Sequence, residues 1–191
     1  MGMTLVSPPE SLARNGPHYL TAFDNVFAPR VASWVRDGHE LFWLAPKTEP
    51  PLTAAKVAAW PGRTGSPMLF WREGESEPLG YLELNPMPNQ KGHLWMGHCV
   101  LAPNCRGVGL GRIMVGLGND EAFGHRSAHR VSLVVFPGNV AAIRCYRAVG
   151  YLKAGDQLKH FATTGKQHVM RRMTIDDDRY QDRRDDGSGQ A

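Results

Sequence analysis

Residues 99–116 read Cys-Val-Leu-Ala-Pro-Asn-Cys-Arg-Gly-Val-Gly-Leu-Gly-Arg-Ile-Met-Val-Gly. The apolar start predicts a strand that ends at Pro103, because proline cannot donate a hydrogen bond to a neighbouring strand. Three glycines at alternate positions follow, and apolar residues then recur with the spacing of one helix face: Leu110, Ile113, Met114 and Leu117. This stretch therefore predicts a strand, a glycine-rich turn and a helix.

A glycine-rich turn before a helix is suited to binding a phosphate. Glycine allows a ligand to approach the backbone closely, and the free amides at a helix start favour an anion. A Walker P-loop does not fit, because Gly111 is followed by Arg112 and Ile113 rather than by Lys and a hydroxyl residue. The dinucleotide fingerprint G-x-G-x-x-G also has a different spacing. The pattern that matches in full is R-x-x-G-x-G, at Arg106, Gly109 and Gly111.

A second motif follows the next predicted strand, residues 130–136, which is apolar at both alternating sets of positions and so reads as a buried parallel strand. The default connection between the two strands is a right-handed crossover. The chain continues Pro-Gly-Asn-Val-Ala-Ala-Ile-Arg-Cys-Tyr-Arg-Ala-Val-Gly-Tyr over residues 137–151. Asn139 suits the N-cap and Gly150 the C-terminal stop of a helix. Residues Asn139, Ala142 and Tyr146 share one face of that helix.

Together, in this order and at this separation, the two motifs resemble the GNAT family of N-acetyltransferases. The resemblance covers residues 80–175 well and the N-terminal third in element order alone. It implies an α/β fold of the acyl-CoA N-acyltransferase type, with a mixed, mostly antiparallel sheet, a central splayed pair of parallel strands and flanking helices.

The resemblance also implies a site for acetyl-CoA. Residues 99–101 would pair with the pantetheine arm, and an amide near Leu101 would polarise the acetyl carbonyl. Tyr146 would be the general acid that protonates the departing thiolate. The implied cofactor-binding residues are Cys99, Val100, Leu101, Arg106, Gly107, Val108, Gly109, Leu110, Gly111, Arg112, Asn139, Ala142 and Tyr146.

The general base is left open by the sequence. Family members with a strand glutamate carry it where this chain has Trp95, and the other common position is Val134. Neither side chain can accept a proton. The two candidates are His98, whose strand parity differs from the usual position, and Glu83 on the neighbouring strand, which also reads as a solvated surface residue. Catalysis by amine positioning alone is the third alternative.

Cysteine nucleophiles and metals are not expected. Cys145 has no base beside it in the sequence and should point away from the face of Tyr146. His125 and His129 have helical spacing, but Gly124 precedes them and no third ligand is near. Three cysteines without a C-x-x-C pair also argue against a disulfide framework.

Composition bounds the remaining classes. The apolar fraction of 42% and the charged fraction of 21% are ordinary for a globular chain. Neither a secretory signal nor an apolar run of ~18 residues is visible, so we expect a cytoplasmic protein away from the membrane. The net charge of +4 is unevenly placed, but the arginines are scattered without a basic run, which argues against nucleic acid. A homodimer stays open.

We expect an irregular lead-in over residues 1–17, one GNAT-like domain over 18–175, and a charged, disordered tail over 176–191, which is rich in aspartate and arginine. Within the domain, residues 41–44 read as a short apolar link. Residues 152–154 and 160–162 read as separate strand pieces on either side of a polar turn.

The predicted activity is transfer of acetyl from acetyl-CoA to a primary amine of a small molecule or a protein, by direct attack in a ternary complex. The alternative is a non-catalytic sensor or partner module that binds acetyl-CoA, suggested by the missing base positions. The N-terminal helices and loops would select the acceptor, and their sequence does not identify it.

Overall fold

The computed structural model describes residues 11–185, which form an eight-stranded sheet with helices on both faces. The strand order is β1-β2-β3-β4-β5-β6-β8-β7, and β5 and β6 are the parallel pair at its centre. The strands are β1 (Ser11–Asn15), β2 (His18–Ala22), β3 (Ser66–Arg72), β4 (Gly80–Pro86), β5 (His93–Leu101), β6 (Arg130–Val135), β7 (Leu152–Phe161) and β8 (Lys166–Asp176). The α-helices are α1 (Ala28–Ser33), α2 (Gly38–Leu44), α3 (Ala54–Ala59), α4 (Leu110–Asp120), α5 (Val140–Val149) and α6 (Asp177–Asp185).

The parallel strands separate soon after they pair. Their register runs from His93↔Arg130 to Trp95↔Ser132, and β5 then continues to Leu101 while β6 stays paired with β8 as far as Val135↔Arg171. The predicted splayed pair is therefore confirmed, and the gap between the two strands widens toward their C-terminal ends.

A bulge in β5 lies beside this gap. The register with β4 jumps from Glu83↔Gly97 to Tyr81↔Val100, so that His98 and Cys99 both lie opposite Leu82. His98 has φ +46°, a left-handed conformation that is uncommon outside glycine. Such bulges redirect a side chain. The alternation of an unbroken strand, from which the sequence placed His98 off the usual acid/base positions, therefore does not apply here.

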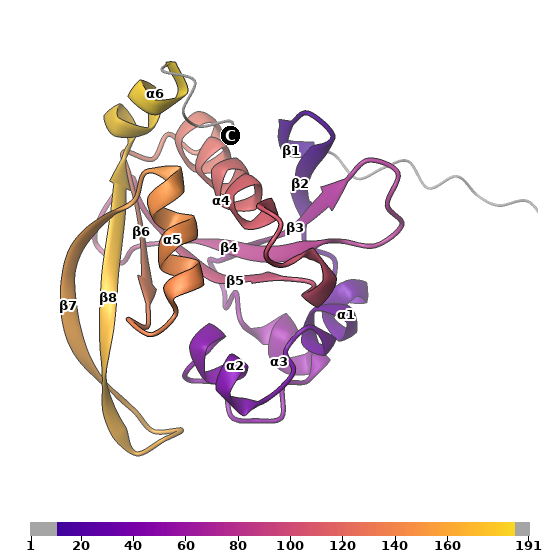
Figure 1. Ribbon diagram of the computed structural model, residues 1–191, viewed down its shortest axis with the longest axis vertical. Coiled ribbons are helices and arrows are strands. Elements are labelled where there is room, and N and C mark those ends of the chain that lie inside the picture. The colour runs from indigo at the N-terminus through magenta and orange to yellow at the C-terminus, as the bar shows by residue number, and fades with distance from the viewer. Residues whose placement is uncertain (1–10, 186–191) are drawn as a thin grey trace, which may run out of the picture.

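The helices lie on the two faces of the sheet, with α4 and α5 on one side and α1, α2 and α3 on the other (Figure 1). Close contacts fix α4 against the sheet: a Cβ added at Gly118 would lie 2.8 Å from Met96. On the opposite face, Trp60 after α3 packs on the Tyr81 ring at 5.9 Å. A smaller apolar cluster under α2 joins Phe42 and Trp43 to Phe136, Phe161 and Met170, with Val134 beside it.

Two N-terminal assignments need correction. Residues 11–15, placed by the sequence in an irregular lead-in, form β1, which pairs with β2 through a turn at Gly16. Residues 41–44 are not a link but the end of α2, whose start is capped by Asp37 accepting from the Glu40 amide at 2.8 Å. Residues 1–10 of the predicted lead-in lie outside the described part of the chain.

The C-terminal assignments also change. Leu152–Phe161 is one continuous strand: after a bulge between Lys153 and Gly155, the stretch expected to be a polar turn pairs regularly with β8 from Gly155↔Arg172 to Phe161↔Lys166. The predicted disordered tail forms α6 as far as Asp185, and its Tyr180 is buried. Residues 186–191 are not described. Among the described helices, none has the length and apolar character to cross a membrane.

Candidate active site

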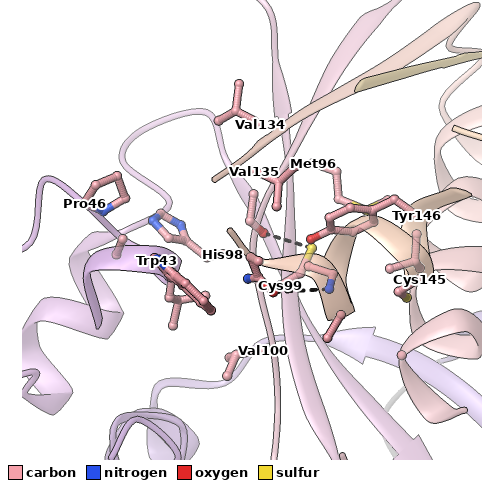
Figure 2. Close-up of a pocket in the computed structure, with 18 of the residues that line it drawn as sticks. Trp43, Pro46, Met96, His98, Cys99, Val100, Val134, Val135, Cys145 and Tyr146 are labelled. Atoms are coloured by element: carbon pink, nitrogen blue, oxygen red, sulfur yellow. Dashed lines mark hydrogen bonds between the residues drawn. The ribbon is translucent and has the colours of Figure 1, made fainter. Parts of the chain in front are cut away.

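A cavity of about 1390 Å³ opens at the separation of β5 and β6. Its lining comes from β5, the glycine turn, α4 and α5 at one end, and from α2, the loop after it, β7 and β8 at the other. Figure 2 shows Trp43 and Pro46 on one side of the strands, Tyr146 and Cys145 on the other, and Cys99 between them.

The glycine turn leaves its backbone exposed to this cavity. Gly107 has φ +80° and Gly109 φ +90°, and a Cβ added at either would meet nothing within 4 Å. Gly109 is the N-cap of α4, so the amides of Leu110 and Gly111 have no intrahelical acceptor, whereas the Arg112 amide donates to the Gly109 carbonyl at 3.0 Å. Open space beside free amides fits a pyrophosphate. Gly111 has another reason to be small, since its Cβ would lie 3.3 Å from Cys145 Sγ.

Arg106 holds this turn to the N-terminal helices. Its Nε donates to the Leu101 carbonyl at 3.0 Å, and its other nitrogens donate to Glu40 at 2.9 Å and to the Trp34 carbonyl at 2.7 Å. The guanidinium thus stabilises the turn's position, a role that the short motif alone did not indicate. Arg112 follows in the first turn of α4 and lines the cavity.

The predicted α5 motif forms as expected in its caps. Asn139 accepts from the Ala142 amide at 3.2 Å, and Gly150 ends the helix with φ +109°. Asn139 and Ala142 both line the cavity with Tyr146. The side-chain oxygen of Asn139 is therefore already engaged as a cap, which leaves its amide group for other partners.

Tyr146 reaches the bulge in β5. Its hydroxyl contacts the thiol of Cys99, and burial, followed by the charges of neighbouring groups, raises the pKa of Tyr146 well above its ordinary value. Burial also raises the pKa of Cys99 to about 12 and that of Cys145 to about 11. Both thiols are thus protonated at neutral pH, which leaves neither of them as a nucleophile.

The two base candidates, Glu83 and His98, form a hydrogen-bonded pair with Glu83 Oε1 2.9 Å from His98 Nδ1. Glu83 is 1% exposed rather than solvated, and it also accepts from the Tyr81 hydroxyl at 2.6 Å and from Asn85 at 3.2 Å. Burial alone would raise the pKa of Glu83, but these hydrogen bonds and the charge of His98 outweigh it and hold the pKa below its usual range. His98 lines the cavity, and its ring stacks on Trp60 at 4.4 Å.

Trp60 is the contact that the sequence could not assign. It lies just after α3, far from His98 in the sequence. The residues next to it in the sequence do not distinguish it from a tryptophan of the core. Trp95 and Val134, which occupy the positions where the family resemblance led us to expect a base, both line the cavity. His125, considered as a metal ligand, bonds instead to Glu121 at 2.8 Å.

The model of the Acetyltransferase (GNAT) family matches residues 29–151 of the sequence. The chain belongs to this family. Solved GNAT structures share the fold at low identity: a spermidine N-acetyltransferase from Vibrio cholerae, in complex with CoA and spermine, has a TM-score of 0.72 at 17% identity over 87% of this chain and 99% of that one. RimJ from Mycobacterium smegmatis, in complex with CoA-disulfide, has a TM-score of 0.71 at 18% identity, with 90% of each chain covered.

A third GNAT neighbour is a ribosomal-protein-S5-alanine acetyltransferase from Vibrio fischeri, with a TM-score of 0.65 at 18% identity over 87% of this chain and 97% of that one. At these identities the similarity shows the fold alone, so the acceptor of this GNAT chain has to be inferred from its own residues.

Proposed function

We propose that this GNAT chain transfers an acetyl group from acetyl-CoA to a primary amine by direct attack. The observation that carries the proposal is the arrangement at the splayed strands. A protonated phenol, Tyr146, and a buried carboxylate–imidazole pair, Glu83 and His98, flank one cavity whose far end is the exposed glycine turn. A module that merely bound acetyl-CoA would need neither group.

The residues present fit acetyl-CoA. The amides of the glycine turn would hold its pyrophosphate, and the free edge of β5 at residues 99–101 would pair with its pantetheine arm, because β6 has already separated there. When bound, acetyl-CoA supplies the thioester that is open to an amine. Peptide N–H groups of the separated edge are available to stabilise a developing oxyanion.

His98 is the proposed general base, and Glu83 is its positioning residue. The Nδ1 hydrogen bond to Glu83 selects the tautomer in which Nε2 carries the lone pair. That nitrogen can then take a proton from the attacking ammonium group or from an intervening water. Stacking on Trp60 holds the plane of the ring. The opposite proton transfer belongs to Tyr146, whose phenol would protonate the departing thiolate.

The experiment that tests this function measures thiol release with a panel of primary amines, and identifies each acetylated product by mass. Acetyl-CoA binding is measured separately by calorimetry. Saturable binding together with acetylation of at least one amine is expected. Saturable binding with no acceptor acetylated would instead favour the sensor or partner module.

The variant His98→Gln tests the proposed base. Its turnover rate should fall below that of the wild type at neutral pH. The difference should narrow as pH rises, because more of the acceptor amine is then unprotonated without a base. Glu83→Gln should lower the turnover rate less than His98→Gln does, with the same dependence on pH, and should leave the KM for acetyl-CoA unchanged. His160, exposed on β7 and not among the lining residues, offers His160→Gln as the matched control. A His98→Gln deficit that is constant across pH would contradict the role of base.

A further inference from the structure

The end of the cavity away from the glycine turn carries positive charge. Lys47 from the loop after α2, Lys159 from β7 and Arg172 from β8 all line it. Within residues 11–185 none of the three forms an ion pair with a carboxylate. Their charges therefore face the cavity without internal neutralisation by the described residues.

The acidic residues that line the same cavity are already engaged. Asp37 caps α2 through the Glu40 amide at 2.8 Å, and Glu40 is paired with Arg36 and with Arg106. Glu83 lies behind His98 and accepts three hydrogen bonds. Among the described lining residues, Asp37 is the one carboxylate without an ion pair, whereas three cations at this end of the cavity also lack one.

Strand register places the cations on the face of the sheet that carries the proposed base. Arg172 pairs with Val134 on β6, and two residues earlier Ser132 pairs with Trp95 on β5. Trp95 in turn pairs with Asn85, which is two residues from Glu83. Since directly paired residues and residues two apart share a face, Arg172 and Glu83 lie on the same side. The same rule places Lys159 on this face too, because its partner His168 is four residues along β8 from Arg172.

The cations also affect one another. Burial lowers the pKa of Lys159, and the charges of Lys47 and Arg172 lower it further. Like charges on one side of a cavity repel each other until an anion lies among them. Apolar side chains of Trp43, Phe161 and Met170 line the neighbouring wall.

We propose that the acceptor is a small primary amine that also carries an anionic group, a carboxylate or a phosphate, bound by Lys47, Lys159 and Arg172 while its amine lies at His98. This inference rests on the proposed function and names the substrate class of the same site. The apolar wall suits a short hydrocarbon spacer between the two ends. A polyamine, whose second charge is positive, would meet three cations in the same place.

The test compares acceptors of equal length that differ in the charge of their far end: ω-amino carboxylates, aminoalkyl phosphates, neutral alkylamines and diamines, each with two to six methylenes. At the best length, kcat/KM for an anionic amine should exceed that for the neutral amine by about tenfold, and the diamine should be the poorest. Carboxylate and phosphate are distinguished by their separate series. Preference for diamines, spermidine or an uncharged peptide N-terminus would overturn the inference while leaving the acetyltransferase function standing.

Charge variants locate the binding site. Lys159→Gln and Arg172→Gln should each raise the KM for the anionic acceptor several-fold and leave that for the neutral alkylamine nearly unchanged. Lys159→Glu should reverse the preference toward the diamine. Lys153→Gln makes the same change of net charge near the other end of β7, where Lys153 pairs with Asp156 outside the cavity lining, and should change neither KM. Equal effects of Lys153→Gln and Lys159→Gln would contradict a local site.

A binding measurement separates this inference from the proposed function. Alkyl carboxylates of the same lengths, which cannot react, are titrated by calorimetry into the CoA-loaded protein. Saturable binding that Lys159→Glu abolishes supports the anion site even if no amine is acetylated, in which case the transferase function fails alone. Absence of binding to the carboxylates and to the corresponding alkyl phosphates would overturn the anion site.

Discussion

A phenol that acts as a general acid must keep its proton at the pH of the reaction, and Tyr146 meets this condition. Burial raises its pKa, and its hydroxyl lies at the thiol of Cys99 in the bulge of β5, where the parting strands leave room for a thioester. A neighbouring protonated thiol places no negative charge beside the phenol at neutral pH. The proton of Tyr146 is thus available for the proposed transfer to the leaving thiolate.

Tyr146→Phe removes this proton and little else. Turnover should fall by about 10²-fold or more, the usual range for a general acid, while calorimetric affinity for acetyl-CoA stays nearly unchanged. Tyr180→Phe is the matched control, because it deletes the same atom on α6, where the hydroxyl donates to Asp120 at 2.9 Å away from the cavity lining. Turnover equal to wild type in Tyr146→Phe would remove its acid role.

Among the elements, α4 begins after Gly109, which has a left-handed conformation, and the first amides of the helix face outward. Gly109→Asp should abolish acetyl-CoA binding, because the new carboxylate would lie where the pyrophosphate is expected. Backbone strain is a competing cause, since a residue with a Cβ is disfavoured at φ +90°. Gly74→Asp introduces comparable strain at φ +81°, in the turn between β3 and β4, also with open space around the Cβ. Calorimetry should show lost binding in the first variant alone, and equal loss in both would contradict the phosphate cradle.

The start of α2 is joined to the same turn by Glu40. Its hydrogen bond from Arg36, assisted by Arg106, lowers the pKa of Glu40 from 4.5 to about 2. A lowered pKa in the folded state stabilises the protein above pH 4.5, and this contribution is lost as pH falls toward 2. Glu40→Gln should therefore lower the melting temperature at pH 7, and the difference from wild type should shrink between pH 4.5 and pH 2. A difference that is unchanged at low pH would contradict the ionic origin.

Elements around the two motifs could be predicted from the sequence. The end of β5 before Pro103 and the caps of α5 at Asn139 and Gly150 follow from local patterns, and the splayed pair follows from the family resemblance; the structure confirms all three. The bulge at His98 could not be predicted, because a parity argument assumes an unbroken pleat. Glu83 was equally hidden, since its burial depends on Tyr81, Asn85 and His98 converging across two strands.

The remaining differences between the sequence-based predictions and the structure come from contacts between segments that are far apart along the chain. Arg106 reaches Glu40, 66 residues away along the chain, and no local motif records such a contact. The composition of residues 176–185 indicates disorder, yet the segment forms α6 because β8 delivers it to a surface already made by α4 and α5. Charged side chains hold it there: Arg179 donates to the Gly150 carbonyl at 2.9 Å and Arg183 to the Ala148 carbonyl at 3.0 Å.

Tyr180 provides the test of this last packing interaction. It is the buried residue of α6, its ring lies 5.1 Å from Phe123, and its hydroxyl also contacts the Gly116 carbonyl at 3.2 Å. Tyr180→Ala should lower the free energy of unfolding by about 3 kcal/mol, as expected for a buried aromatic, with the KM for acetyl-CoA little changed. Tyr180→Phe, which keeps the ring, should cost about 1 kcal/mol. Chemical denaturation measures both, and wild-type stability in Tyr180→Ala would mean that α6 does not pack on the domain in solution.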